Sequence, residues 1–213
     1  MTEQDDDERQ RSPSKHKAAL VLIDVINDMA FEGGVELRAN AGDAFNRIAA
    51  LRDDADALGI PVIYVNDNGG HWRSERSRIL ENALAHDSPG RELIERLKPR
   101  PEDYFVIKPH LSGFYATNLP VLLPKLGANR LVLTGVATDI CVLFTAADAH
   151  MREYDLWVPR DAVAAEHGDR SDWALDIMQK SMNAEVRASS ELSLNDFVAS
   201  DPKTEPALVA EAS

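Results

Sequence analysis

Short apolar runs alternate with longer amphipathic segments along most of the chain. The candidate strands are residues 18–23, 62–65, 104–107, 131–133, 156–158 and, more weakly, 184–186. Polar residues do not alternate within these runs, which is typical of central parallel strands covered by helices on both faces. Strands separated by helices predict an α/β fold, namely a three-layer α/β/α doubly wound sandwich with a six-stranded parallel sheet.

The junctions between the expected helices and strands carry matching stop signals. The segment ADALG ends in Gly59, a residue suited to the left-handed end of a helix, and Pro61 opens the next strand. The segment PKLG ends in Gly127, which is expected to stop a second helix in the same way. Residues 1–17 and 199–213 lack apolar periodicity and are expected to be flexible tails around one domain, residues 18–198.

Composition narrows the class of protein. The chain has 213 residues, of which 44% are hydrophobic, enough for the core of one soluble domain, and it has no run of eighteen apolar residues that could span a membrane. The first residues contain no apolar stretch, so neither a secretory signal nor a transit peptide is predicted, and a cytoplasmic location is expected. The net charge of -13 argues against a nucleic-acid partner and favours a small molecule.

Ligands of such sheets bind outside the carboxyl ends of the strands, where the strand order reverses. The residues expected at this edge include a carboxyl, a lysine and a thiol: Asp24 follows the first run, Lys108 the third, and Cys141 the turn GVATDIC after the fourth. A nearby ammonium would favour the ionised forms of both Asp24 and Cys141. The edge therefore contains the components of a catalytic site.

Cys141 is the only cysteine of the chain, so it has no intramolecular disulfide partner. Thr138 is a good residue for a helix N-cap and Asp139 for a first turn, which places Cys141 in the first turn of a helix. The positive end of that helix would lower the pKa of the thiol. A buried structural thiol is the alternative, since free cysteines are often buried.

Other catalytic systems lack their defining residues. A haloacid-dehalogenase-type phosphatase needs a second aspartate two positions after Asp24, where this chain has Ile26. The chain has no G-x-S-x-G elbow, no phosphate loop and no G-x-G-x-x-G turn. Five of the six histidines lie in the expected domain and are scattered without the close spacing of metal ligands: His71, His86, His110, His150 and His167.

Three segments in this order, ALVLIDVINDM, VIKPHLSGF and LVLTGVATDICV, resemble the isochorismatase-like superfamily of cysteine hydrolases. This superfamily includes nicotinamidases, N-carbamoylsarcosine amidohydrolase and ureidoacrylate amidohydrolase. The resemblance covers roughly residues 18–190, and the last segment is the most specific.

The resemblance implies a six-stranded parallel sheet and a catalytic triad of Asp24, Lys108 and Cys141. It also implies a cis peptide bond between Val136 and Ala137, and an oxyanion hole made by the N–H groups of Ala137 and Cys141. Asp24 would take the thiol proton, Cys141 would attack a planar amide or ureido carbonyl, and Lys108 would hold Asp24. The expected chemistry is hydrolysis of a C–N bond through a thioester, without a cofactor.

The chain departs from nicotinamidases in the turn after the second strand. Their metal site uses a D-x-H sequence, and here Asp67 matches but Gly69 stands where the first histidine belongs. We therefore expect no bound metal and do not expect nicotinamide to be the substrate. Candidate substrate contacts are His71, Trp72 and Arg73 after the second strand and Phe114 after the lysine, because a flat molecule needs an aromatic wall and a carboxylate needs an arginine.

Two other functions remain open from the sequence. The first is vinyl ether hydrolysis of the isochorismatase type, although several such relatives lack the cysteine. The second is a catalytically silent relative that serves in binding or assembly, in which Cys141 would matter only for stability. Relatives that form dimers or tetramers lead us to expect a homo-oligomer.

Overall fold

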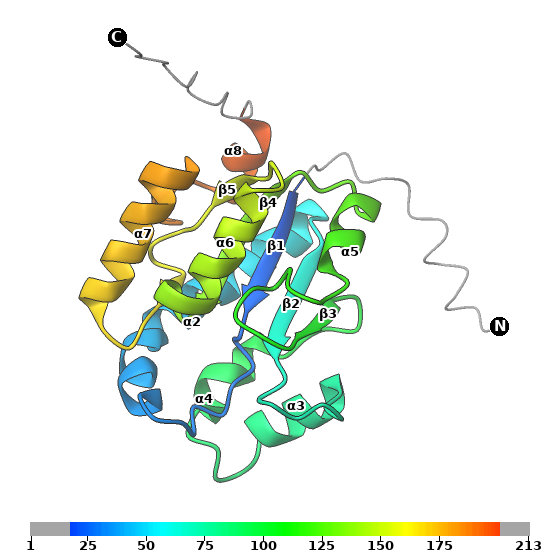
Figure 1. The fold of residues 1–213 in the computed structure, drawn as a ribbon, viewed down its shortest axis with the longest axis vertical. Coiled ribbons are helices and arrows are strands. Elements are labelled where there is room, and N and C mark those ends of the chain that lie inside the picture. Colours follow the sequence, from blue (N-terminus) through cyan, green and yellow to red (C-terminus); the bar gives the residue numbers. More distant parts are fainter. Residues whose placement is uncertain (1–17, 201–213) are drawn as a thin grey trace, which may run out of the picture.

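Six parallel strands form the central layer of the computed structural model, which describes residues 18–200 (Figure 1). They are β1 (Ala18–Ile23), β2 (Val62–Asp67), β3 (Tyr104–Lys108), β4 (Arg130–Val136), β5 (Asp155–Trp157) and β6 (Val163–Ala164). Five of them lie in the order β3-β2-β1-β4-β5, and β6 pairs with β4. Because β2 and β4 flank β1 on opposite sides, the strand order reverses beside the carboxyl end of β1.

The sixth strand differs from the one expected at residues 184–186. That segment makes only an isolated bridge, between Trp157 and Glu185, and the sixth strand is the two-residue β6. The apolar signal at 184–186 comes instead from burial, since Ala184 and Val186 pack into the core. The other five predicted runs all form strands, β1 to β5.

Helices cover both faces of the sheet (Figure 1). One face packs against α2 (Gly34–Leu58), α4 (Arg91–Ile94), the 3-10 helix η1 (Glu95–Leu97) and α8 (Leu194–Ala199). The other face packs against α5 (Leu119–Lys125), α6 (Leu143–His150) and α7 (Gly168–Met182). A further helix, α3 (Arg76–Ala83), follows β2 and lies below the carboxyl ends of the strands in the view of Figure 1. The expected three-layer architecture is confirmed.

The predicted helix stops are observed. Gly59 caps α2 in the left-handed conformation, and Gly127 after α5 has a φ of 69°. Helix α8 runs to Ala199, and Ser200 accepts a hydrogen bond from Arg130, so residues 199 and 200 of the expected C-terminal tail contact the domain. The rest of the two expected tails lies outside the described residues. No helix within residues 18–200 combines the length and apolar character needed to cross a membrane.

Gly135 allows β4 to approach β1 closely at the edge that carries the site. Its φ is 113°, and a Cβ atom at this position would overlap the backbone of Ile23, including the carbonyl oxygen. Only glycine adopts this conformation at low cost. The absence of a side chain at residue 135 therefore sets the spacing between β1 and β4, where the strand order reverses.

We expect Gly135→Ala to lower the free energy of unfolding by about 3 kcal/mol or more, because backbone strain adds to a clash with backbone that cannot move aside. Urea denaturation followed by circular dichroism measures the loss. The matched control is Gly42→Ala in α2, where an added Cβ atom meets nothing within 4 Å. This control should gain about 0.5–1 kcal/mol. Equal stabilities of the two variants would contradict the assignment of Gly135.

Candidate active site

Asp24, Lys108 and Cys141 meet at the carboxyl edge of the sheet. The Lys108 Nζ atom lies 2.8 Å from Asp24 Oδ2 and 3.4 Å from Cys141 Sγ. Lys108 is completely buried, and its side chain comes from the last residue of β3, two strands away from β1. The three residues that the strand-end argument selected thus form one contiguous cluster.

The backbone after β1 presents the Asp24 carboxylate to its partners. Asp24 has a φ of 51°, a left-handed conformation that aspartate tolerates better than most residues. Its N–H donates to the Val65 carbonyl at 2.9 Å, and its Oδ1 atom accepts a hydrogen bond from the Asp67 N–H at 2.7 Å. One carboxylate oxygen is therefore held by backbone and the other by Lys108.

Cys141 lies in a π-helical turn, Thr138–Val142, that connects β4 to α6. The N-cap is Ala137, so the expected capping role of Thr138 is wrong: Thr138 is inside the turn, and its hydroxyl accepts a hydrogen bond from Ser171. The peptide bond between Val136 and Ala137 is cis, as the resemblance implied. Single π-helical turns are rare and occur often at functional sites.

The pKa of the Cys141 thiol is raised to about 12, mainly by burial and then by the negative charge of Asp24, against which Lys108 acts. The expectation that the helix terminus lowers this pKa is therefore wrong. The sequence placed the thiol near a favourable helix dipole, but burial of the thiol and then the Asp24 carboxylate beside it raise its pKa. Burial and Asp24 thus both favour the protonated thiol.

The same burial affects the two charged partners. It raises the pKa of Asp24 despite the opposing effect of Lys108, which makes this carboxylate a stronger base than an exposed one. Burial alone would lower the pKa of Lys108, but the charges of Asp24, Cys141 and Asp67 outweigh it and raise that pKa. The cluster thus holds one firmly protonated lysine, and a carboxylate and a thiol that compete for a proton.

Asp67 is a second carboxylate on Lys108, which the sequence pattern did not indicate. Its Oδ2 atom lies 3.3 Å from the Lys108 Nζ atom, and its Oδ1 atom accepts the Gly69 N–H at 2.6 Å. The residue that matches a nicotinamidase metal ligand, Asp67, is thus engaged with a lysine, and Gly69 offers no side chain. Among residues 18–200 no group of three or more His, Cys, Asp or Glu side chains is placed to hold a metal ion. The donors present do not fit the nicotinamidase metal site.

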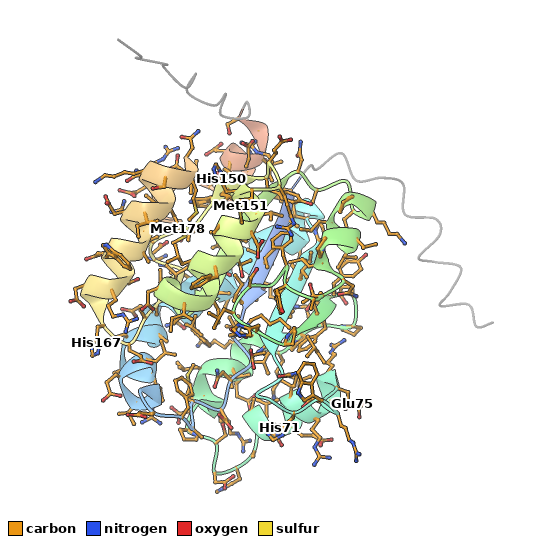
Figure 2. The ribbon with its side chains drawn as sticks, viewed as in Figure 1. His71, Glu75, His150, Met151, His167 and Met178 are labelled. Carbon is orange, nitrogen blue, oxygen red and sulfur yellow. The ribbon has the colours of Figure 1, made fainter. Side chains whose placement is uncertain are left out.

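The expected substrate contacts fall into two environments. His71, Trp72 and Arg73 are exposed in the loop after β2, and Trp72 is 81% exposed. Figure 2 shows His71 at the end of the molecule where the strands finish, near α3, whereas His150 lies at the far end of α6. Phe114 is only 3% exposed and packs against Tyr154, beneath the Arg152 guanidinium. A packing role for Phe114 was not evident from its position after the lysine.

A model of the isochorismatase domain matches residues 18–191. The chain belongs to the isochorismatase family. It is 35% identical over 179 residues to the isochorismatase family protein YaaI of Bacillus subtilis (strain 168), a match that covers 84% of this chain and 98% of that protein. It is also 35% identical over 160 residues to the ureidoacrylate amidohydrolase RutB of Methylobacterium radiotolerans, covering 63% of this chain and 62% of RutB.

Solved structures of the isochorismatase family agree. N-carbamoylsarcosine amidase from Thermoplasma acidophilum is 32% identical with a TM-score of 0.64, and the match covers 83% of this chain and 99% of that one. The nicotinamidase from Staphylococcus aureus is 26% identical with a TM-score of 0.63, covering 81% and 99%. The protein is an isochorismatase-family hydrolase whose relatives include amidases that act on non-peptide C–N bonds.

Proposed function

We propose that this isochorismatase-family protein is a metal-independent cysteine amidohydrolase that cleaves a C–N bond of a small amide, carbamoyl or ureido compound. The observation that supports this most is the contact of one buried lysine, Lys108, with both the Asp24 carboxylate and the Cys141 sulfur. A base, a nucleophile and a fixed positive charge are the groups that covalent amide hydrolysis needs.

The first half of the reaction forms a thioester. Asp24 takes the thiol proton as the Cys141 sulfur attacks the carbonyl carbon, and the negative charge moves to the carbonyl oxygen. The N–H groups of Ala137 and Cys141 receive this oxyanion. Asp24 then gives the proton to the nitrogen, the C–N bond breaks, and ammonia or an amine leaves. The raised pKa of the thiol fits a proton transfer that occurs during the attack rather than before it.

The second half returns the enzyme to its starting state. Asp24 takes a proton from water, the hydroxide attacks the thioester, and the Cys141 sulfur leaves and regains the proton. Lys108 keeps its proton throughout, because its pKa is raised, and it balances the charge that moves between Asp24 and Cys141. No step requires a cofactor.

The loop after β2 supplies the proposed substrate contacts. His71, Trp72 and Arg73 follow Asp67, whose backbone holds Asp24, so the loop is attached directly to the catalytic cluster. Arg73 suits a substrate carboxylate and Trp72 a flat ureido or amide plane. Phe114 would act indirectly, through the segment into which it packs. A cytoplasmic homo-oligomer remains our expectation.

The experiment is a panel of primary amides, N-carbamoyl acids and ureido acids, with release of ammonia as the readout and a vinyl ether substrate as the alternative. We expect ammonia release by the wild type, none by Cys141→Ala, and no change after dialysis against a chelator. Turnover of the vinyl ether alone would identify an ether hydrolase. Equal rates for wild type and Cys141→Ala, or loss of rate after chelation with recovery on adding zinc, would overturn the proposal.

A further inference from the structure

The turn that carries Cys141 is bonded on its other side to the first turn of α7. The Arg170 Nε atom lies 2.6 Å from Asp139 Oδ2, and the Ser171 hydroxyl donates to the Thr138 hydroxyl oxygen at 2.9 Å. Two consecutive residues of α7 thus bind two consecutive residues of the π-helical turn. These four residues, Thr138, Asp139, Arg170 and Ser171, are called the turn clamp below.

The two ends of the ion pair are buried to different degrees. The Asp139 side chain is 4% exposed, whereas the Arg170 side chain is 53% exposed. A carboxylate buried to this extent needs a charged or hydrogen-bonding partner, because its desolvation is costly. Arg170 can supply that partner cheaply, since its own guanidinium keeps contact with water. Removing Arg170 would therefore leave a buried negative charge two residues from Cys141.

The clamp and the catalytic cluster hold opposite sides of the same turn. Residues two apart in a helical turn point in roughly opposite directions, since each residue advances by about 100° in an α-helix and less in a π-helix. Accordingly Asp139 pairs with α7, while Cys141 faces Lys108 on β3. Thr138 is completely buried. The position of the sulfur depends on both sets of contacts.

We propose that Arg170 is a positioning residue for the nucleophile. It fixes the π-helical turn through its ion pair with Asp139. It also neutralises the Asp139 carboxylate, so that the unbalanced negative charge of Asp139 does not act on Cys141. Ser171 supports the same turn through Thr138. The inference rests on the proposed function for its effect on turnover, but its effect on the thiol can be measured without any substrate.

The test measures the rate of Cys141 alkylation by iodoacetamide across pH, together with kcat, KM and unfolding by urea. For Arg170→Ala we expect kcat to fall about tenfold or more at nearly constant KM, and the alkylation profile to move to higher pH by about one pH unit, as a nearby unbalanced carboxylate would cause. Arg170→Lys should recover much of both losses. The double variant Asp139→Asn/Arg170→Ala should recover the alkylation profile, because it removes the unbalanced charge.

The matched control is Lys180→Ala, which breaks an exposed ion pair with Asp176 elsewhere on α7. It should match the wild type in every measurement. If Arg170→Ala is poorly folded, Ser171→Ala tests the second link of the clamp, with a smaller fall in kcat expected. The inference would be overturned if Arg170→Ala had the alkylation profile and the kcat of the wild type. The same result for Ser171→Ala would overturn it if that variant is used instead. A wild type without Cys141-dependent turnover, whose alkylation still responds to Arg170→Ala, would overturn the proposed function alone.

Discussion

An Asp24→Asn variant is expected to lose turnover while its Cys141 thiol becomes more reactive toward iodoacetamide at neutral pH. Asparagine cannot accept the thiol proton, and loss of a general base lowers kcat by about 10²- to 10⁴-fold. The negative charge of Asp24 is also one of the causes that raise the pKa of Cys141, whereas Lys108 lowers it. Removing that charge should therefore lower the thiol pKa from about 12 and increase the thiolate fraction.

The two readouts of Asp24→Asn separate a catalytic carboxylate from a structural one. Asparagine can still accept the Asp67 N–H, so the local backbone should be preserved. The matched control is Asp28→Asn in the same loop, whose carboxylate accepts only a local N–H bond from Ala30 among its described contacts. That control should change neither kcat nor alkylation. If Asp24→Asn were alkylated more slowly than the wild type, the Asp24 charge would not raise the pKa of the Cys141 thiol as stated.

A Lys108→Met variant is expected to lose both stability and activity. Lys108 is fully buried beside the Asp24 carboxylate, and removing one partner of a buried ion pair costs about 3–5 kcal/mol in the free energy of unfolding. Turnover should fall as well, because nothing else in the cluster balances the charge on Asp24 or Cys141. Urea denaturation and kcat measure the two effects, with the exposed Lys125→Met in α5 as the control that should change neither.

The stability of Lys108→Met should depend on pH in a defined direction. Burial already raises the pKa of Asp24 above its ordinary value, and loss of Lys108 removes the main effect that lowers it. A carboxyl whose pKa is higher in the folded protein than in the unfolded chain stabilises the fold at low pH, and this contribution is lost as pH rises through the folded pKa. The deficit of Lys108→Met against the wild type should widen from acidic to neutral pH. A deficit that shrinks over this range would contradict the burial of Asp24 next to Lys108.

The fold and the meeting of three polar side chains could be predicted because both depend on the ends of strands. Continuous apolar runs indicate parallel strands, and parallel strands bring their carboxyl ends to one edge. Asp24, Lys108 and Cys141 each stand at such an end, so their meeting follows from topology. The edge strand β6 could not be found this way, because two residues are too few to form a pattern.

Features that depend on three-dimensional distance were beyond the sequence. The direction of the Cys141 pKa depends on whether burial and Asp24 outweigh Lys108 and the helix terminus, and residue spacing does not give those distances. Asp67 and Lys108 lie on two different strands, and no sequence motif indicates that their side chains make contact. Arg170 and Asp139 are thirty-one positions apart, and they meet only because α7 packs directly against the turn Thr138–Val142 as well as against α6.

The central claim is that Cys141 carries the acyl group during cleavage of a C–N bond. The most direct measurement uses the first substrate found in the amide and ureido panel, with rapid acid quenching and tandem mass spectrometry of the peptide that contains Cys141. We predict a transient acyl adduct on the Cys141 sulfur that hydroxylamine removes, and its absence in Cys141→Ala together with loss of turnover. Ammonia release at the wild-type rate by Cys141→Ala, or an adduct on another residue, would contradict the account.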